Sequence, residues 1–204
     1  MDHGTIITAS AGNDATDGNA TSLSQWSGVV GVAAIGIDNS RQDYSSWGQG
    51  VTTAAVGGPL AVHDYVSGQV TQVSGTSVSA PIVAGTLALA RQKWPNATSN
   101  QLLQLLVKTG LNPDHGWNQY TGHGAIDPAT MVNTDPSQFP DENPLADKGG
   151  GSSPTREEVQ QYADGVVDPT QIVNDNSYTY RGLDESKLTD QMNTSVTQIG
   201  RAHV

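Results

Sequence analysis

The sequence predicts an α/β fold with a doubly wound, mainly parallel sheet. Three short runs rich in apolar and β-branched residues, at positions 5–10, 29–37 and 51–56, predict strands buried on both faces. Longer apolar segments with helical length follow, at 78–93 and 99–109. Buried strands combined with helices in this way are typical of a parallel sheet covered by helices.

Local signals set the limits of the strands. The first run follows Gly4, which is a helix stop. The second ends at the turn signal Asp38-Asn39-Ser40 and is followed by a short polar segment, residues 44–48. The third ends at Gly57-Gly58-Pro59. With these limits, all three runs have the length of strands.

The two helices are predicted to differ in their surroundings. The segment 78–93 is apolar almost all round, and Pro81 is tolerated because it lies in the first turn. We therefore expect this helix to lie in the core. The second helix begins at a capping box formed by Thr98 and Gln101, and it stops at Gly110.

Composition excludes several classes of protein. The 204 residues carry a formal net charge of −11, with 35% apolar residues and a mean hydropathy of −0.39. No run approaches the roughly 18 apolar residues of a membrane-spanning helix. An acidic surface repels phosphate backbones, so we expect no nucleic-acid partner. The absence of cysteine excludes disulfides, thiolate metal sites and a thiol nucleophile.

The chain is predicted to have four parts. Residues 1–131 hold nearly all the apolar runs and form the folded domain. Residues 132–154 are rich in Pro, Gly and Ser and are predicted to be a linker. The acidic tail, 155–198, has one short helix after the capping box of Thr155 and Glu158, and is otherwise extended or disordered. We expect residues 199–204 to be a non-native scar.

The strongest chemical signal is the turn Gly75-Thr76-Ser77, which leads directly into the apolar helix. It places Ser77 at the helix N-terminus, where free N–H groups and the helix dipole stabilise a developing negative charge. A nucleophile in acyl transfer needs such stabilisation, because the attacked carbonyl becomes an oxyanion. The alternative is that Thr76 or Ser77 is an ordinary N-cap residue.

A second signal, Ser10-Ala11-Gly12-Asn13, lies at the carboxyl end of the first strand. Ligands bind at this end of an open parallel sheet. The Asn13 amide can donate a hydrogen bond to an oxyanion, and the small residues before it form a flat wall. The alternative is a plain turn, because Gly-Asn-Asp is common turn chemistry.

Together these motifs resemble the C-terminal half of the catalytic domain of subtilisin-like serine proteases, the subtilase family. The resemblance covers residues 1–131 and includes the Asn block, the nucleophile block and two further segments. These four blocks are residues 11–13, 29–48, 75–85 and 122–127, the last of which resembles the strand that closes the domain. Val78 and Ile82 depart from the commonest family pattern without touching a proton-transfer role.

The resemblance implies roles for individual residues. Ser77 would be the nucleophile, and the Asn13 side chain and the Ser77 backbone N–H would donate to the oxyanion. Ser10, Ala11 and Gly12 would line the specificity pocket. Gly75 and Thr76, the neighbours of the nucleophile, would border the bound substrate. The family also implies a bacterial secreted or cell-surface enzyme that cleaves proteins or peptides, with calcium as a possible cofactor.

The family's catalytic Asp and His are expected far upstream of the Asn block, and no residue here fits them. His3 lies too close to Asn13, and His63, His115 and His123 lie in loop-like contexts where we expect them exposed or locally hydrogen-bonded. No metal site is predicted from the residues themselves. We therefore expect a fragment that lacks the N-terminal half of its domain and is inactive alone, since serine needs a base.

Two alternatives stay open at this point. One is a non-catalytic binding module derived from a subtilase, which the missing Asp and His favour. The other is a different α/β hydrolase, which would carry Gly-x-Ser-x-Gly. Here Ser79 stands where that motif needs its second glycine, so the sequence disfavours this alternative.

Overall fold

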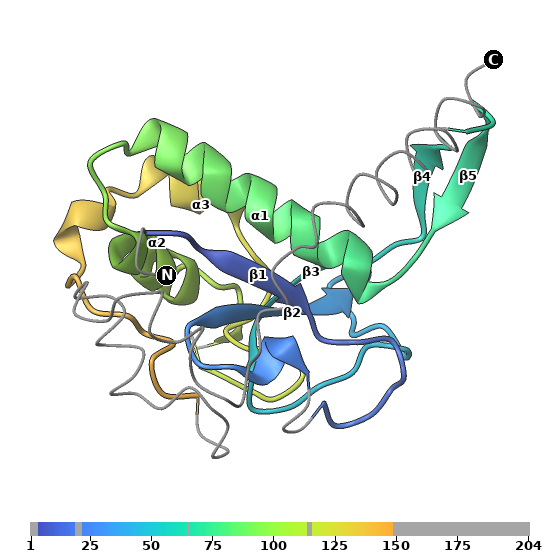
Figure 1. Cartoon of the computed structure of the whole chain (residues 1–204), viewed down its shortest axis with the longest axis horizontal. Helices are drawn as coiled ribbons and strands as arrows, with labels where there is room; N and C mark the ends of the chain where they lie inside the picture. Colours follow the sequence, from blue (N-terminus) through green and yellow to red (C-terminus); the bar gives the residue numbers. More distant parts are fainter. Residues whose placement is uncertain (1–3, 19–21, 65, 114–115, 149–204) are drawn as a thin grey trace, which may run out of the picture.

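The structure, a computed structural model, describes residues 4–18, 22–64, 66–113 and 116–148. The chain forms a parallel sheet of three strands in the order β1-β2-β3 (Figure 1). The strands are β1 (Ile7–Ser10), β2 (Val29–Ile35) and β3 (Val51–Val56). Since the strands are parallel, their carboxyl ends lie at the same edge of the sheet, and this edge positions the candidate site.

The central strand confirms the predicted burial on both faces. All seven residues of β2 are buried. Val30 and Val32 belong to the larger core cluster, whereas Ala33 and Ile35 belong to the smaller one. The prediction is wrong for β1, where Ile7 is 37% exposed. The reason is that β1 is an edge strand, whose outer edge pairs with no other strand in the described part of the chain.

The helices complete the larger core. Helix α1 (Thr76–Lys93) runs along the sheet (Figure 1) and buries Val83 and Leu87. Helix α2 (Ser99–Lys108) begins at the predicted capping box, in which both reciprocal hydrogen bonds are present. The remaining short helices are η1 (Leu23–Gln25), α3 (Pro128–Asn133) and η3 (Pro136–Gln138).

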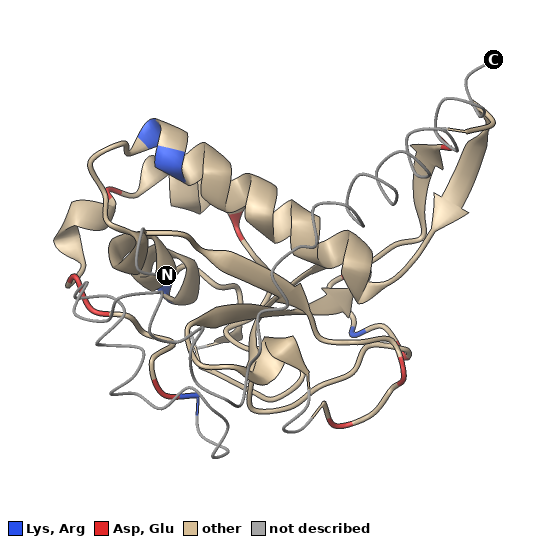
Figure 2. Ribbon diagram, viewed as in Figure 1, with Lys and Arg blue, Asp and Glu red and all other residues tan. Residues whose placement is uncertain are grey.

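Helix α1 is not buried on every side, so the sequence prediction is wrong on this point. Its outer face exposes Ile82 (37%) and Leu89 (55%). Figure 2 shows that α1 carries no charged residue until Arg91 and Lys93 in its last turn. The helix is therefore apolar, as predicted, but no other part of the described chain covers its outer face.

A hairpin that the sequence does not predict connects β3 to α1 along the chain. Strands β4 (Leu60–His63) and β5 (Val70–Val73) pair antiparallel and project away from the body of the protein (Figure 1). Most of their residues are exposed, which explains why no buried-strand pattern marks them. His63 is among the exposed residues, as expected.

The predicted linker begins inside the packed structure. Leu145 and Ala146 are buried, and the Leu145 carbonyl accepts a hydrogen bond from the Gly28 N–H (2.7 Å). The boundary at residue 131 therefore has to move to at least Lys148. The packing depends on a few apolar side chains between prolines, which a composition-based reading treats as linker.

The predictions for the closing strand and for the end of the chain have different outcomes. The closing strand at 122–127 is reduced to an isolated parallel bridge between Ala54 and Ala125. The rest of the linker, the acidic tail with its short helix, and the scar at 199–204 lie outside the described residues. Among the residues described, none of the helices is both long and apolar enough to span a membrane.

Candidate active site

Asn13 lies just beyond the carboxyl end of β1. The chain leaves the sheet through Ala11, whose N–H donates to the Val32 carbonyl (2.9 Å). Gly12 follows with a φ of 112°, and a side chain at this position would crowd the Ser46 hydroxyl. The Ser46 N–H in turn donates to the Gly12 carbonyl (2.9 Å). The turn that carries Asn13 is thus fixed on both sides.

Ser77 is exposed in the first turn of α1. The N-cap residue is Gly75, with a φ of 149°, and no side chain caps the helix. The alternative that Thr76 or Ser77 is an ordinary N-cap is therefore wrong. The Gly75 N–H donates to the Gly57 carbonyl (2.8 Å), which ties the start of the helix to the carboxyl end of β3.

Thr76 connects the two predicted motifs. The Asn13 Oδ1 atom accepts hydrogen bonds from the Thr76 N–H (2.8 Å) and the Thr76 hydroxyl (2.9 Å). The same hydroxyl accepts from the Gly12 N–H (3.2 Å). Because the acceptor atom of the Asn13 amide is occupied, its Nδ2 donor points away from Thr76 and is available to a ligand.

Ser77 and Asn13 converge on the surface beside Gly75. The position that a Gly75 Cβ atom would take lies 3.0 Å from the Ser77 Oγ and 3.1 Å from the Asn13 Nδ2. The hydroxyl and the amide donor are therefore at most about 6 Å apart, although 64 positions separate them in the sequence. Any larger residue at 75 would fill the space between them.

The predicted substrate wall needs a correction. Ser10 and Gly12 are half-buried, but Ala11 is only 3% exposed and its side chain packs in the smaller core cluster. Thr76 is completely buried. The side chains of Ala11 and Thr76 therefore cannot line the substrate surface, and Thr76 positions Asn13 instead. Sequence position alone does not separate a wall residue from the residue that supports the wall.

Three residues support the site through hydrogen bonds that the sequence does not predict. The Tyr44 hydroxyl donates to the Gly57 carbonyl (2.7 Å), and burial raises the pKa of this phenol. The Ser79 hydroxyl, also buried, donates to the Ala55 carbonyl (3.0 Å). The Ser46 hydroxyl accepts from the Asp14 N–H (3.3 Å). The sequence marks them only in that they belong to the segments 44–48 and 75–85.

No described histidine or carboxylate forms a hydrogen bond to Ser77. His123 lies beside the start of β3, at the other end of the sheet, where its N–H donates to the Thr52 carbonyl. The expectation that His123 is exposed or locally hydrogen-bonded is wrong for its ring, which is half-buried and whose Nδ1 has no hydrogen-bond partner. Burial lowers the pKa of His123. His3 and His115 lie outside the described residues.

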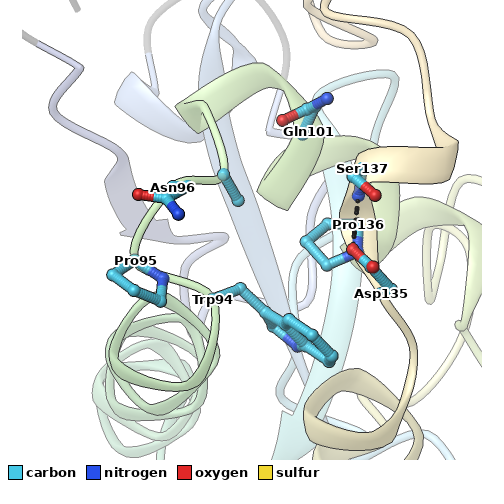
Figure 3. A pocket seen from close by; sticks show the side chains of 8 residues that line it. Trp94, Pro95, Asn96, Gln101, Asp135, Pro136 and Ser137 are labelled. Atoms are coloured by element: carbon cyan, nitrogen blue, oxygen red, sulfur yellow. Dashed lines mark hydrogen bonds between the residues drawn. The ribbon is translucent and has the colours of Figure 1, made fainter.

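A separate cavity of about 230 Å³ lies near the other end of α1 (Figure 3). Trp94 and Pro95, which follow α1, line it together with Pro136 of η3. Since α1 has 18 residues, its two ends are about 27 Å apart. This cavity is therefore not part of the Ser77 site.

The next question is whether the described side chains could bind a metal ion. They contain no group of three or more His, Cys, Asp or Glu side chains that could hold an ion. No step of the chemistry is assigned to the calcium that the resemblance implies.

The sequence matches a known family. The model of the subtilase family matches residues 1–124. The chain belongs to the subtilase family. Among its curated relatives, Subtilisin DY of Bacillus licheniformis is 31% identical over 127 residues, which cover 60% of this chain and 45% of that protein. The halolysin-like extracellular serine protease Nep of Natrialba magadii is 31% identical over 141 residues, covering 65% of this chain and 24% of that protein.

Solved subtilases support the same fold. The crystal structure of MycP1 with its N-terminal propeptide removed superposes with a TM-score of 0.57 at 26% identity. The match covers 68% of this chain and 54% of the MycP1 chain. The chain spans about half the length of these relatives, or less. The subtilisin-like α/β fold predicted from the sequence is therefore confirmed.

Proposed function

We propose that this subtilase chain provides the nucleophile and the oxyanion hole of a serine endopeptidase. The observation that carries the proposal is the convergence of the Ser77 Oγ and the Asn13 Nδ2 on one exposed point. In acyl transfer the hydroxyl attacks a peptide carbonyl, and the carbonyl oxygen becomes an oxyanion. The Asn13 amide and the Ser77 N–H at the helix N-terminus are the donors that stabilise it.

The catalytic Asp and His come from a part of the protein outside these 204 residues. No described group beside Ser77 can remove its proton, and a serine without a base is a poor nucleophile. In subtilisin itself, loss of an oxyanion donor costs about 2.7–4 kcal/mol, whereas loss of the triad costs about 2 × 10⁶ in rate. The 204-residue chain alone is therefore expected to be inactive.

The missing N-terminal half fits the exposed surfaces of this chain. The outer face of α1 is apolar and the outer edge of β1 is unpaired among the described residues. A further strand beside β1 and a helix on α1 would bury both. The substrates are proteins or peptides, and the extracellular relative named above supports secretion or display at the cell surface.

A fluorogenic-peptide assay tests this function. The 204-residue chain should show no turnover above buffer. The longer gene product that includes the Asp and His should cleave the peptide, and Ser77→Ala should reduce its kcat to the level of a triad-less protein. Turnover that survives Ser77→Ala in the longer protein would contradict the proposal.

A non-catalytic binding module derived from a subtilase is the second candidate. The absence of an acid and a base beside Ser77 among the described residues favours it. The residues encoded before Met1 distinguish the two candidates, because a protease requires an Asp block and a His-Gly-Thr block there.

A further inference from the structure

Lys148 makes an unusual contact with the backbone at the base of the sheet. Its Nζ donates hydrogen bonds to the carbonyl oxygens of Ser24 (2.9 Å) and Gly50 (2.6 Å). Ser24 lies in η1, and Gly50 directly precedes β3. Lys148 is half-buried, and the removal of its amine from water lowers the pKa of that amine to about 7.

The two carbonyl oxygens form a concentrated acceptor site. A Cβ atom at Gly31 would collide with the oxygens of both Ser24 and Gly50, so both lie close to this one position on β2. Two buried acceptors that approach each other need donors, because an unpaired buried carbonyl costs free energy. A primary amine offers at least two N–H groups on one atom, whether it is charged or neutral.

Lys148 thereby fastens the last described segment to the sheet. We call residues 143–148 the strap. Leu145, within the strap, is buried, and its carbonyl accepts a hydrogen bond from the Gly28 N–H (2.7 Å) just before β2. The strap thus crosses the amino ends of β2 and β3, and the amine of Lys148 is its last contact.

Solvent reaches this region through a cavity of about 400 Å³. Lys148 and Asp147 line it together with Val51, Thr52, Trp117 and His123. A small molecule that enters this cavity arrives beside the amine of Lys148. The cavity lies at the opposite end of the strands from Ser77, so it is separate from the candidate active site.

We propose that the carbonyl pair of Ser24 and Gly50 is a binding site for a primary amine, which the chain occupies with its own Lys148 to latch the strap onto the domain. The property that the site recognises is a pair of N–H donors rather than charge alone. A small alkylamine should therefore replace the side chain when Lys148 is truncated.

The test compares amines and cations in the full chain with Lys148→Ala. Loss of these two partly buried hydrogen bonds should lower the Tm by about 4–8 °C. Propylammonium chloride should restore about half of this loss at about ten times its Kd. Tetramethylammonium chloride and potassium chloride at the same concentration carry charge without N–H donors and should not. Lys108→Ala, which removes an exposed lysine of α2, is the matched control and should respond equally to all three salts.

Proteolysis provides a second measurement of the release of the strap. The bond after Glu142 lies where the strap begins, and Glu142 is exposed. A glutamate-specific protease should therefore cleave Lys148→Ala several-fold faster at this bond than the wild type, and propylammonium should slow the cleavage.

Clear results would overturn the proposal. Equal rescue by potassium or tetramethylammonium would show that charge alone is recognised. If Lys148→Ala does not fold, Lys148→Met keeps most of the apolar stem and removes only the donors. A Lys148→Met chain with the Tm and the Glu142 cleavage rate of the wild type would show that no latch exists.

Discussion

The Asn13 side-chain oxygen accepts two hydrogen bonds from Thr76, one from its N–H at 2.8 Å and one from its hydroxyl at 2.9 Å. Thr76 is completely buried, so its effect on a substrate passes through Asn13. The pair joins the end of β1 to the start of α1 and fixes which atom of the Asn13 amide faces outward.

Thr76→Val tests this positioning role in the longer protein that carries the whole triad. Valine keeps the shape of threonine but loses the hydroxyl, so Asn13 is held by one hydrogen bond instead of two. We expect kcat to fall about tenfold, equivalent to about 1.4 kcal/mol, with little change in KM. Thr76→Ser keeps the hydroxyl and should retain most of kcat. A Thr76→Val enzyme with the wild-type kcat would contradict the role.

Ser79→Ala should destabilise the chain although it lies only two residues from Ser77. The Ser79 hydroxyl is buried and bonded to the Ala55 carbonyl, and its removal leaves that carbonyl without this donor. Urea unfolding should show a loss of about 1–2 kcal/mol. Ser77→Ala is the control, since its exposed hydroxyl should contribute less than about 0.5 kcal/mol. Equal losses for the two variants would contradict the assignment of Ser79 to structure and Ser77 to chemistry.

The uncovered face of α1 should make the 204-residue chain self-associate. Ile82 and Leu89 are exposed on a face without charge, and such faces bury themselves against one another. Sedimentation velocity should show concentration-dependent association that Leu89→Lys weakens. Gln92→Lys, at the charged end of the helix, should change it little. A wild-type chain that stays monomeric at all concentrations would show that this face needs no partner.

The amine of Lys148 predicts a rise in stability with pH. Burial lowers its pKa from 10.5 to about 7 in the folded chain. Between these values the unfolded chain binds a proton that the folded chain does not, so the free energy of unfolding increases with pH. Asp147 and His123 line the same cavity, but the lowered pKa of His123 places its titration below this window. Urea unfolding at pH 7 and pH 10 should show the rise in the wild type and a smaller rise in Lys148→Met; identical slopes would contradict it.

The sequence predicts those parts of the fold in which local and tertiary signals agree. The third strand lies at 51–56 as predicted, and the capping box of Thr98 and Gln101 starts α2. Ser77 lies at the start of a helix because glycine and small residues precede a long apolar run. These features depend on neighbours in sequence, which is why pattern reasoning finds them.

Other features depend on contacts that no pattern encodes. The exposure of Ile7 and Leu89 depends on what lies beside β1 and α1, not on their own residue types. The burial of Leu145 and the position of the Lys148 amine depend on Gly28, Ser24 and Gly50, which lie about a hundred positions away. Likewise, Thr76 matches the family motif whether it contacts a substrate or supports Asn13, and only the coordinates separate these roles.

The most direct test of the catalytic pair is a crystal structure of the longer protein after reaction with a peptidyl fluorophosphonate. The proposed function predicts a covalent bond from phosphorus to the Ser77 Oγ, with the phosphoryl oxygen about 2.7–3.1 Å from both the Asn13 Nδ2 and the Ser77 backbone nitrogen. An adduct on another residue, or a phosphoryl oxygen that points away from Asn13, would contradict the proposed catalytic pair.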